Sequence, residues 1–102
     1  MRVIAKRTLK NFWTQPLYRD SEQPLRAWYS EAKSFKWSKT QDIKDKYINA
    51  SFLANNRVIF NIHGNKYRLI VAVDYPREAI FIKFIGTHKE YDSINANDVS
   101  MN

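Results

Sequence analysis

The sequence predicts an α+β fold in which helices cover one face of a four-stranded antiparallel sheet. Apolar residues recur at helical spacing up to residue 32, whereas from Arg57 onward three β-branched and aromatic runs follow one another, separated by turn signals. The expected order is β-α-α-β-β-β, followed by a short C-terminal helix. A chain of 102 residues has room for one such core, so we expect a single domain over residues 1–102.

The N-terminal half carries the helix signals. Val3-Ile4-Ala5 predicts a short first strand, and the helical stripe that follows ends before Pro16. The members of that stripe are Leu9, Phe12 and Trp13. A second helix is expected to start with Asp20 or Ser21 as its cap, with Pro24 tolerated in the first turn. Its buried side chains are expected to be Leu25, Trp28 and Ala32. A short helix over 40–47 completes this half.

The C-terminal half contains three strand-like runs, at 58–62, 67–73 and 80–85. Between the first two lies Gly64-Asn65, a two-residue loop with glycine at its first central position, as a type II′ turn requires. Tyr75-Pro76-Arg77-Glu78 forms a four-residue turn before the third run. Tight turns of this kind join antiparallel neighbours, which is why an antiparallel sheet is expected.

The hairpin loop also predicts which side chains share a face. With Gly64-Asn65 as the loop, Asn61 lies opposite Arg68, and pairing across the next turn puts Lys83 diagonal to Arg68. Ile70 then faces Lys83, and Ile85 faces Arg68. The opposite face is almost pure hydrocarbon and is the expected helix-facing core: Phe60, Ile62, Leu69, Val71, Ile80, Ile82 and Phe84. The polar set fits an ordinary solvent-exposed face and an anion site about equally well.

Composition restricts the class of protein. There is no cysteine, which excludes disulfides and a cysteine nucleophile, and no run approaches the ~18 apolar residues of a membrane span. The start of the chain has no apolar core of a secretion signal, so a cytoplasmic location is expected. Seventeen basic residues against ten acidic ones give a net charge of +7. This excess suits a polyanionic partner as well as it suits a merely solvated surface.

The positive charge is concentrated in the first half of the chain, where residues 1–50 carry eleven basic and five acidic side chains. Lys33, Lys36 and Lys39 follow the second helix and are interleaved with aromatic residues. We expect them to contact RNA phosphate, with a solvated face as the equally weighted alternative. Asn61, Lys66 and Lys89 are the further RNA-binding candidates.

The segment after the last strand, Gly86-Thr87-His88-Lys89-Glu90-Tyr91-Asp92, contains the pattern of a capping box. This pattern accounts for Thr87 and Glu90 but not for His88 and Tyr91. Residues three apart lie on one face of a helix, so His88 and Tyr91 are expected to project together beside Arg68 and Lys83.

These four side chains suit metal-free RNA cleavage. The reaction needs a base for the 2′-hydroxyl proton, an acid for the leaving 5′-oxygen and cations for the charged phosphorane. Histidine transfers protons near neutral pH, Arg and Lys supply charge, and Tyr can donate a hydrogen bond or stack on a base. His63, next to the turn, is interpreted as a surface residue. Acidic residues lack ligand spacing, so neither a metal nor another cofactor is expected.

Two blocks resemble the signature of HigB-type toxins of the RelE-like superfamily. The first is the run from Val58 to Val71, and the second is Phe84–Asp92, with the near-terminal T-H-x-E-Y-D. Ala27-Trp28 and Trp37 with Asp42-Ile43-Lys44 are similar to the weaker upstream motifs of the family. The resemblance implies a RelE-like fold and cleavage of messenger RNA during translation on the ribosome. It also implies a cognate helix-turn-helix antitoxin, HigA-like, through which alone the toxin would reach operator DNA.

The resemblance and the chemistry together select Arg68, Lys83, His88 and Tyr91 as catalytic candidates. A runner-up interpretation is a non-catalytic RNA- or ribosome-binding module that blocks translation by occupancy, in which His88 is only a contact. A DNA-binding repressor is a weaker third interpretation, because no helix-turn-helix pattern is visible.

Overall fold

Most helices lie in the first half of the chain, and the long strands lie in the second half. The computed structural model describes residues 1–101. In chain order the elements are β1 (Arg2–Ile4), α1 (Lys6–Trp13), the 3₁₀ helix η1 (Pro16–Ser21), α2 (Glu22–Ser34), α3 (Thr40–Lys46), β2 (Ser51–Phe52), β3 (Arg57–Ile62), β4 (Tyr67–Asp74), β5 (Ala79–Thr87) and α4 (His88–Asp92). Within the described residues, no helix has the length and apolar character needed to cross a bilayer.

The α+β class is confirmed, but the sheet differs from the expected one. It has five strands in the order β1-β5-β4-β3-β2, and β1 runs parallel to β5. No tight turn joins β1 to β5, so nothing in the local sequence constrained the direction of this pair. The additional strand, β2, pairs with β3 through only two residues, which is too short a run to show strand alternation. The expectation of four antiparallel strands is therefore corrected to a five-stranded mixed sheet.

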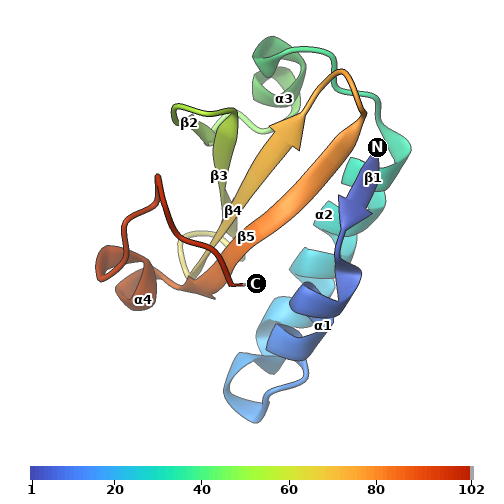
Figure 1. Cartoon of the computed structure of the whole chain (residues 1–102). Coiled ribbons are helices and arrows are strands. Elements are labelled where there is room, and N and C mark those ends of the chain that lie inside the picture. Colours follow the sequence, from blue (N-terminus) through green and yellow to red (C-terminus); the bar gives the residue numbers. More distant parts are fainter. Residues whose placement is uncertain (102) are drawn as a thin grey trace.

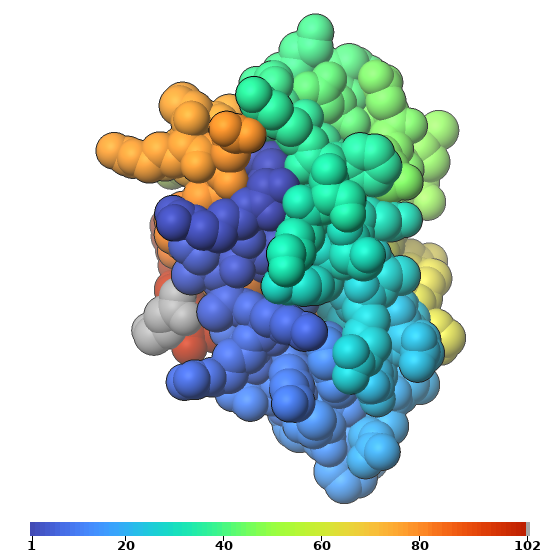
Figure 2. Space-filling view, turned by 90° about the vertical axis from the view of Figure 1, so that its right-hand side faces the viewer, coloured from blue at the N-terminus to red at the C-terminus, as the bar shows by residue number. Residues whose placement is uncertain are grey.

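Helices α1 and α2 pack on one face of the sheet (Figure 1). The helical spacing predicted which side chains they bury, and all of these side chains lie in the main core: Leu9, Phe12, Trp13, Leu25, Trp28 and Ala32. Figure 2 looks onto this side of the molecule, where α1 and α2 lie side by side and cover the sheet. Ser21 occupies the predicted cap position of α2, but its hydroxyl donates to the Tyr18 carbonyl instead of capping the helix.

The β3–β4 hairpin has the predicted turn and register. Gly64 adopts φ +64°, a left-handed conformation that glycine reaches at little cost, and the Lys66 amide donates to the His63 carbonyl at 3.2 Å. Asn61 pairs directly with Arg68, as expected. The hairpin therefore presents these two side chains on the same face of neighbouring strands.

The β4–β5 pairing contains a bulge that the sequence analysis missed. Asp74 pairs with Ala79 as expected, but the register shifts between Ile70 and Val71, which pair with Phe84 and Ile82. Lys83 is the extra residue, so the predicted pairs of Ile70 with Lys83 and of Arg68 with Ile85 are wrong. The bulge exchanges the faces of the residues after it. Phe84, expected on the helix-covered face, lies on the other face, and Ile85 joins the main core.

The second face of the sheet is also covered, contrary to the expectation that helices lie on one face only. Ile59, Ile70 and Phe84 form a small buried cluster there. Residues of α4 and of the C-terminal segment pack against it: Tyr91, Ile94, Ala96 and Val99. Arg57 fastens this segment, because its Nη1 donates to the carbonyls of residues 96 and 99 at 3.0 and 2.8 Å. Figure 1 shows α4 and the C-terminal segment on the side of the sheet away from α1 and α2.

Candidate functional site

The candidate site lies where β5 ends and α4 begins, beside the β3–β4 hairpin. The start of α4 is secured by the predicted capping box: the Glu90 amide donates to Thr87 Oγ1 at 3.1 Å, and the Thr87 amide donates to Glu90 Oε1 at 2.8 Å. The main-chain amide of His88 also donates to the Lys66 carbonyl at 3.0 Å, which ties α4 to the hairpin. The first turn of α4 is thus held against the end of the hairpin.

Gly86 makes this approach of α4 to the sheet possible. It pairs with Arg68 across β4 and β5 and carries no side chain. A Cβ atom at this position would lie 2.6 Å from Phe84 Cζ and 3.1 Å from Glu90 Oε1. The absence of a side chain therefore leaves room both for the Phe84 ring and for the capping carboxylate.

Three of the four predicted catalytic residues come together, and we name Arg68, His88 and Tyr91 the hairpin-end cluster. The Arg68 guanidinium carbon lies 6.0 Å from the centroid of the Tyr91 ring, and the His88 and Tyr91 ring centroids are 6.5 Å apart. Tyr91 also packs against the apolar cluster of the second face, which limits its movement. Tyr91 thus lies beside Arg68 as expected, and His88 lies beside Tyr91 on the same helix.

Lys83 does not join this cluster. Its ammonium lies over the Phe81 ring at 5.9 Å from the centroid, and it stands three residues along β5 from Gly86, the partner of Arg68. Three strand residues span about 10 Å. The predicted diagonal contact between Lys83 and Arg68 is therefore wrong, and its cause is the bulge.

Arg68 is oriented by the main chain of the hairpin. Its Nη1 donates to the carbonyls of Asn65 and Tyr67 at 3.0 and 3.2 Å. An arginine carries five N–H donors, so these bonds hold the guanidinium while other donors remain for an anion. Asn61, directly opposite, is exposed on the same face.

Asp92 is a site residue that the sequence analysis did not select. Its Oδ2 lies 3.2 Å from His88 Nδ1, and the two residues are four apart on α4. A carboxylate in this position orients the imidazole and holds a proton on Nδ1, which leaves Nε2 for proton exchange with a ligand. The His88 side chain is 52% exposed and so remains accessible to a ligand. The i,i+4 spacing of the two residues was the signal that could have identified Asp92.

A second polar cluster attaches the hairpin to η1. Asp20 accepts hydrogen bonds from Lys66 and from the Tyr67 hydroxyl, and His63 Nε2 lies 3.7 Å from its Oδ2. The bonds from Lys66 and Tyr67 lower the pKa of Asp20 below its usual value. Burial, followed by the Asp20 bond and charge, raises the pKa of Tyr67. Lys66, an RNA-binding candidate, is thus partly committed to Asp20.

The remaining lysine candidates divide between the two ends of the sheet. Lys89 is exposed on α4, beside the hairpin-end cluster. Lys36 lies 3.9 Å from Glu78 in the β4–β5 turn, at the other end of β4, and Lys33 and Lys39 flank it in sequence. In Figure 2 the turquoise-green segment after α2 lies beside the orange β4–β5 turn. The structure does not bring Lys33, Lys36 and Lys39 to the hairpin-end cluster.

Among residues 1–101, no three His, Cys, Asp or Glu side chains are arranged to hold a metal ion. The five-stranded mixed sheet and the helices packed on it form an α+β architecture consistent with a RelE-like fold. A family model described as HigB_toxin, the RelE-like toxic component of a toxin–antitoxin system, matches residues 21–94. This segment is well over half of the chain, so the chain belongs to the HigB toxin family. A comparison with curated proteins found no match. Membership of this family implies an antitoxin partner.

Proposed function

We propose that this toxin is a metal-independent endoribonuclease that cleaves messenger RNA and thereby inhibits translation and growth. The observation that carries the proposal is the hairpin-end cluster, in which a fixed guanidinium, an imidazole and a phenol lie together at an exposed sheet end. Arg68 would bind the phosphate, and histidine is the type of side chain best suited to transfer a proton in such a reaction.

Each member of the cluster has a defined role in this proposal. Arg68 stabilises the negative charge that develops on the phosphorane, because its donors are oriented before the substrate arrives. His88 transfers a proton to or from a reacting oxygen, with Asp92 orienting its ring. Tyr91 holds Arg68 through its ring and offers a hydroxyl to the substrate. Lys83 is removed from the reaction centre and is proposed to attract RNA from its place on β5.

The biological setting follows from the family and is part of the same proposal. We infer that the toxin acts in the cytoplasm, on mRNA that a ribosome is translating. Its partner is a HigA-like helix-turn-helix antitoxin, which neutralises the toxin and carries it to operator DNA.

The proposal is tested with Arg68→Ala and His88→Gln in a translation extract, by mapping new RNA 5′ ends. Each variant should lose the ~10²–10⁴-fold rate that a missing proton-transfer or charge-stabilising group typically costs. Melting curves and capture by the antitoxin should match the wild type, because both side chains are partly exposed. Activity in the presence of EDTA, measured on isolated RNA, tests the independence from metal.

Two matched controls sharpen the test. His63→Gln alters the other histidine, which lies at the same hairpin but outside the cluster, and should cleave at the wild-type rate. Lys83→Ala should lose far less than Arg68→Ala. A His88→Gln toxin that cleaves normally would remove His88 from the chemistry. Translation blocked without any new 5′ ends would favour the alternative, a toxin that inhibits by occupying RNA or the ribosome.

A further inference from the structure

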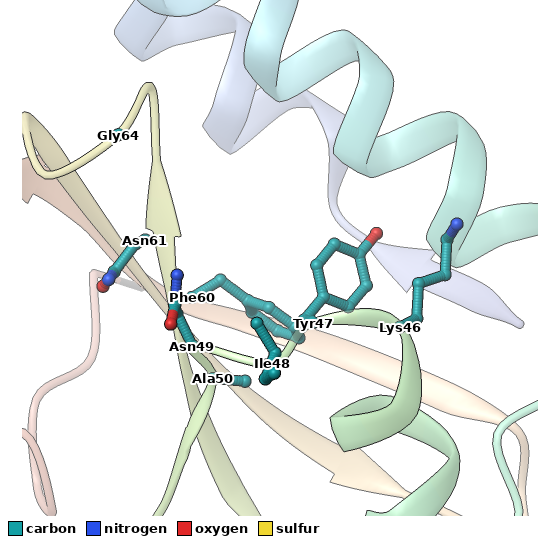
Figure 3. A pocket seen from close by; sticks show the side chains of 8 residues that line it. All are labelled: Lys46, Tyr47, Ile48, Asn49, Ala50, Phe60, Asn61 and Gly64. Atoms are coloured by element: carbon teal, nitrogen blue, oxygen red, sulfur yellow. The ribbon is translucent and has the colours of Figure 1, made fainter.

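A pocket opens at the outer edge of β3, and its lining includes Asn61, the cross-strand partner of Arg68. Strand β2 pairs with β3 only through Ser51 and Phe52, and the chain before it turns away, with the Ala50 amide donating to the Tyr47 carbonyl at 3.0 Å. Within the described residues, the edge of β3 from Phe60 to Ile62 therefore has no neighbouring strand. The gap holds a pocket of about 330 Å³, lined by residues 46–50 on one side and by Phe60, Asn61 and Gly64 on the other (Figure 3).

The walls of this pocket are held in place by specific contacts. Lys44 Nζ donates to the carbonyls of Ile48 and Ala50 at 2.6 and 2.9 Å, which fixes the loop before β2. The Tyr47 ring packs edge-on against Phe60 with centroids 5.0 Å apart, and its hydroxyl donates to Glu31. These contacts fix the loop and the Tyr47 ring that form one wall of the pocket.

The lining suits an uncharged group with polar edges. Phe60 is 1% exposed and forms a buried floor, whereas Asn49 and Asn61 are exposed at the rim. An asparagine amide offers both donors and an acceptor, and an unpaired strand edge offers main-chain N–H and C=O groups. The adjacent lysines are already engaged: Lys44 holds the loop, and Lys46 Nζ lies 3.5 Å from Glu31. Planar bases with hydrogen-bonding edges match this lining better than phosphate does.

The position of the pocket relates it to the proposed reaction. Asn61 lies on its rim and pairs directly with Arg68. The main chain of Asn61 therefore lies about one strand spacing, ~4.8 Å, from that of Arg68, on the edge of β3 where the pocket opens. We propose that it binds the nucleobase adjacent to the phosphate that Arg68 contacts. This inference rests on the proposed action on RNA and adds the site that selects a base.

The test uses non-cleavable 2′-O-methyl tetranucleotides, one for each base, titrated into the toxin and followed by NMR of its backbone amides. Oligonucleotides with bases should shift the amides of Ala50, Phe60 and Asn61, and an abasic analogue of equal charge should not. Asn49→Ala and Asn61→Ala should each weaken binding roughly three- to tenfold, the effect of one or two hydrogen bonds. Asn11→Ala, an exposed change on α1, is the matched control and should bind like the wild type.

The outcomes separate this inference from the proposed nuclease activity. Base-dependent shifts in a toxin that cleaves no RNA would support base binding in the pocket and contradict the proposed nuclease activity. Equal binding of the abasic analogue, or no shift at the pocket, would overturn the pocket even if cleavage occurs. A third result would also overturn it. If the two asparagine variants lose affinity for the antitoxin but not for the oligonucleotides, the edge of β3 binds a strand of the antitoxin and not a base.

Discussion

At the residue scale, the guanidinium of Arg68 is already oriented before any ligand arrives. Two main-chain carbonyls of the hairpin and the ring of Tyr91 surround it. Donors oriented in advance stabilise a developing charge without a cost of reorganisation at the moment of reaction. His88 has a similar arrangement, with Asp92 at 3.2 Å from its Nδ1. Arg68 and His88, the two groups proposed to act on the phosphate, are thus held by main-chain carbonyls, by Tyr91 and by Asp92.

Asp92→Asn tests this dependence. The amide keeps the size of the side chain but loses its negative charge, so it holds the imidazole less firmly. We expect kcat to fall about tenfold, less than the ~10²–10⁴-fold expected for His88 itself, while KM stays unchanged. Cleavage kinetics on a defined mRNA measure both constants. Asp98→Asn, an exposed carboxylate outside the cluster, is the control, and a rise in KM alone would contradict the positioning role.

Gly86→Ala tests the space beneath α4. The new Cβ would lie 2.6 Å from Phe84 Cζ, so either the ring or α4 must move. Overpacking of this kind costs about 1–3 kcal/mol of unfolding free energy, and urea unfolding measures it. The same change should cost less in a Phe84→Leu background, because leucine lacks the clashing ring atom. Equal costs in both backgrounds would show that Phe84 is not the obstacle.

At the element scale, the bulge in β5 places Lys83 away from the hairpin-end cluster. The run from Ile80 to Ile85 is apolar at every position except Lys83, so both faces of the strand could have joined the core. One extra residue at Lys83 moves Phe84 to the second face, where α4 and the C-terminal segment cover it. Alternation along β5 could not reveal this, because either phase buries hydrocarbon.

The attachment of the hairpin to η1 through Asp20 predicts a pH dependence of stability. Hydrogen bonds from Lys66 and Tyr67 lower the Asp20 pKa below its unfolded value of about 3.9. A lowered folded pKa means that the stabilisation is present above the unfolded value and is lost as the pH falls through the folded value. The stability difference between wild type and Asp20→Asn should be constant from pH 5 to 7 and shrink below about pH 4.

Urea midpoints between pH 2.5 and 7 measure this difference. Lys66→Met should reduce the acid dependence, because Lys66 is the largest cause of the lowered Asp20 pKa. If Asp20→Asn and wild type lose stability in parallel down to pH 2.5, the carboxylate does not hold the hairpin.

At the scale of the whole molecule, Arg68 and the lysines proposed to bind RNA lie at two separate ends of the sheet. Strand β4 has eight residues, which corresponds to about 25 Å between the hairpin end and the β4–β5 turn. Arg68, Lys66 and Lys89 lie at the first end, and Lys36 is paired with Glu78 at the second. An RNA held at Arg68 must therefore extend along the molecule to reach the lysines after α2.

This separation predicts a dependence on RNA length. The triple change of Lys33, Lys36 and Lys39 to alanine should weaken binding of a 20-nucleotide RNA and lower the salt slope, by up to about 0.7 for each phosphate that is no longer neutralised. Binding of a tetranucleotide should not change. Fluorescence anisotropy at several salt concentrations measures both. If the long RNA shows an unchanged salt slope, these lysines form a solvated face and bind no phosphate.

Local patterns in the sequence determined much of this protein. Helical spacing selected the buried side chains of α1 and α2, the Gly64-Asn65 loop predicted the pairing of Asn61 with Arg68, and the capping box predicted α4. These features depend on residues close together in the chain, where propensity and periodicity act. The motifs around β3, β4 and α4 also sufficed to indicate the family.

Tertiary structure alone decided the remaining features of the site. The parallel pairing of β1 with β5 and the bond from Tyr67 to Asp20 join residues far apart in the sequence. The bulge at Lys83 decides between two registers that bury similar apolar side chains. The pocket beside Asn61 exists because the residues that precede Ser51 do not pair with β3. No local sequence pattern predicts where this pairing stops. Strand direction and register here depend on the packing of the whole chain. Where the local sequence pattern allows two arrangements of similar energy, long-range contacts decide between them.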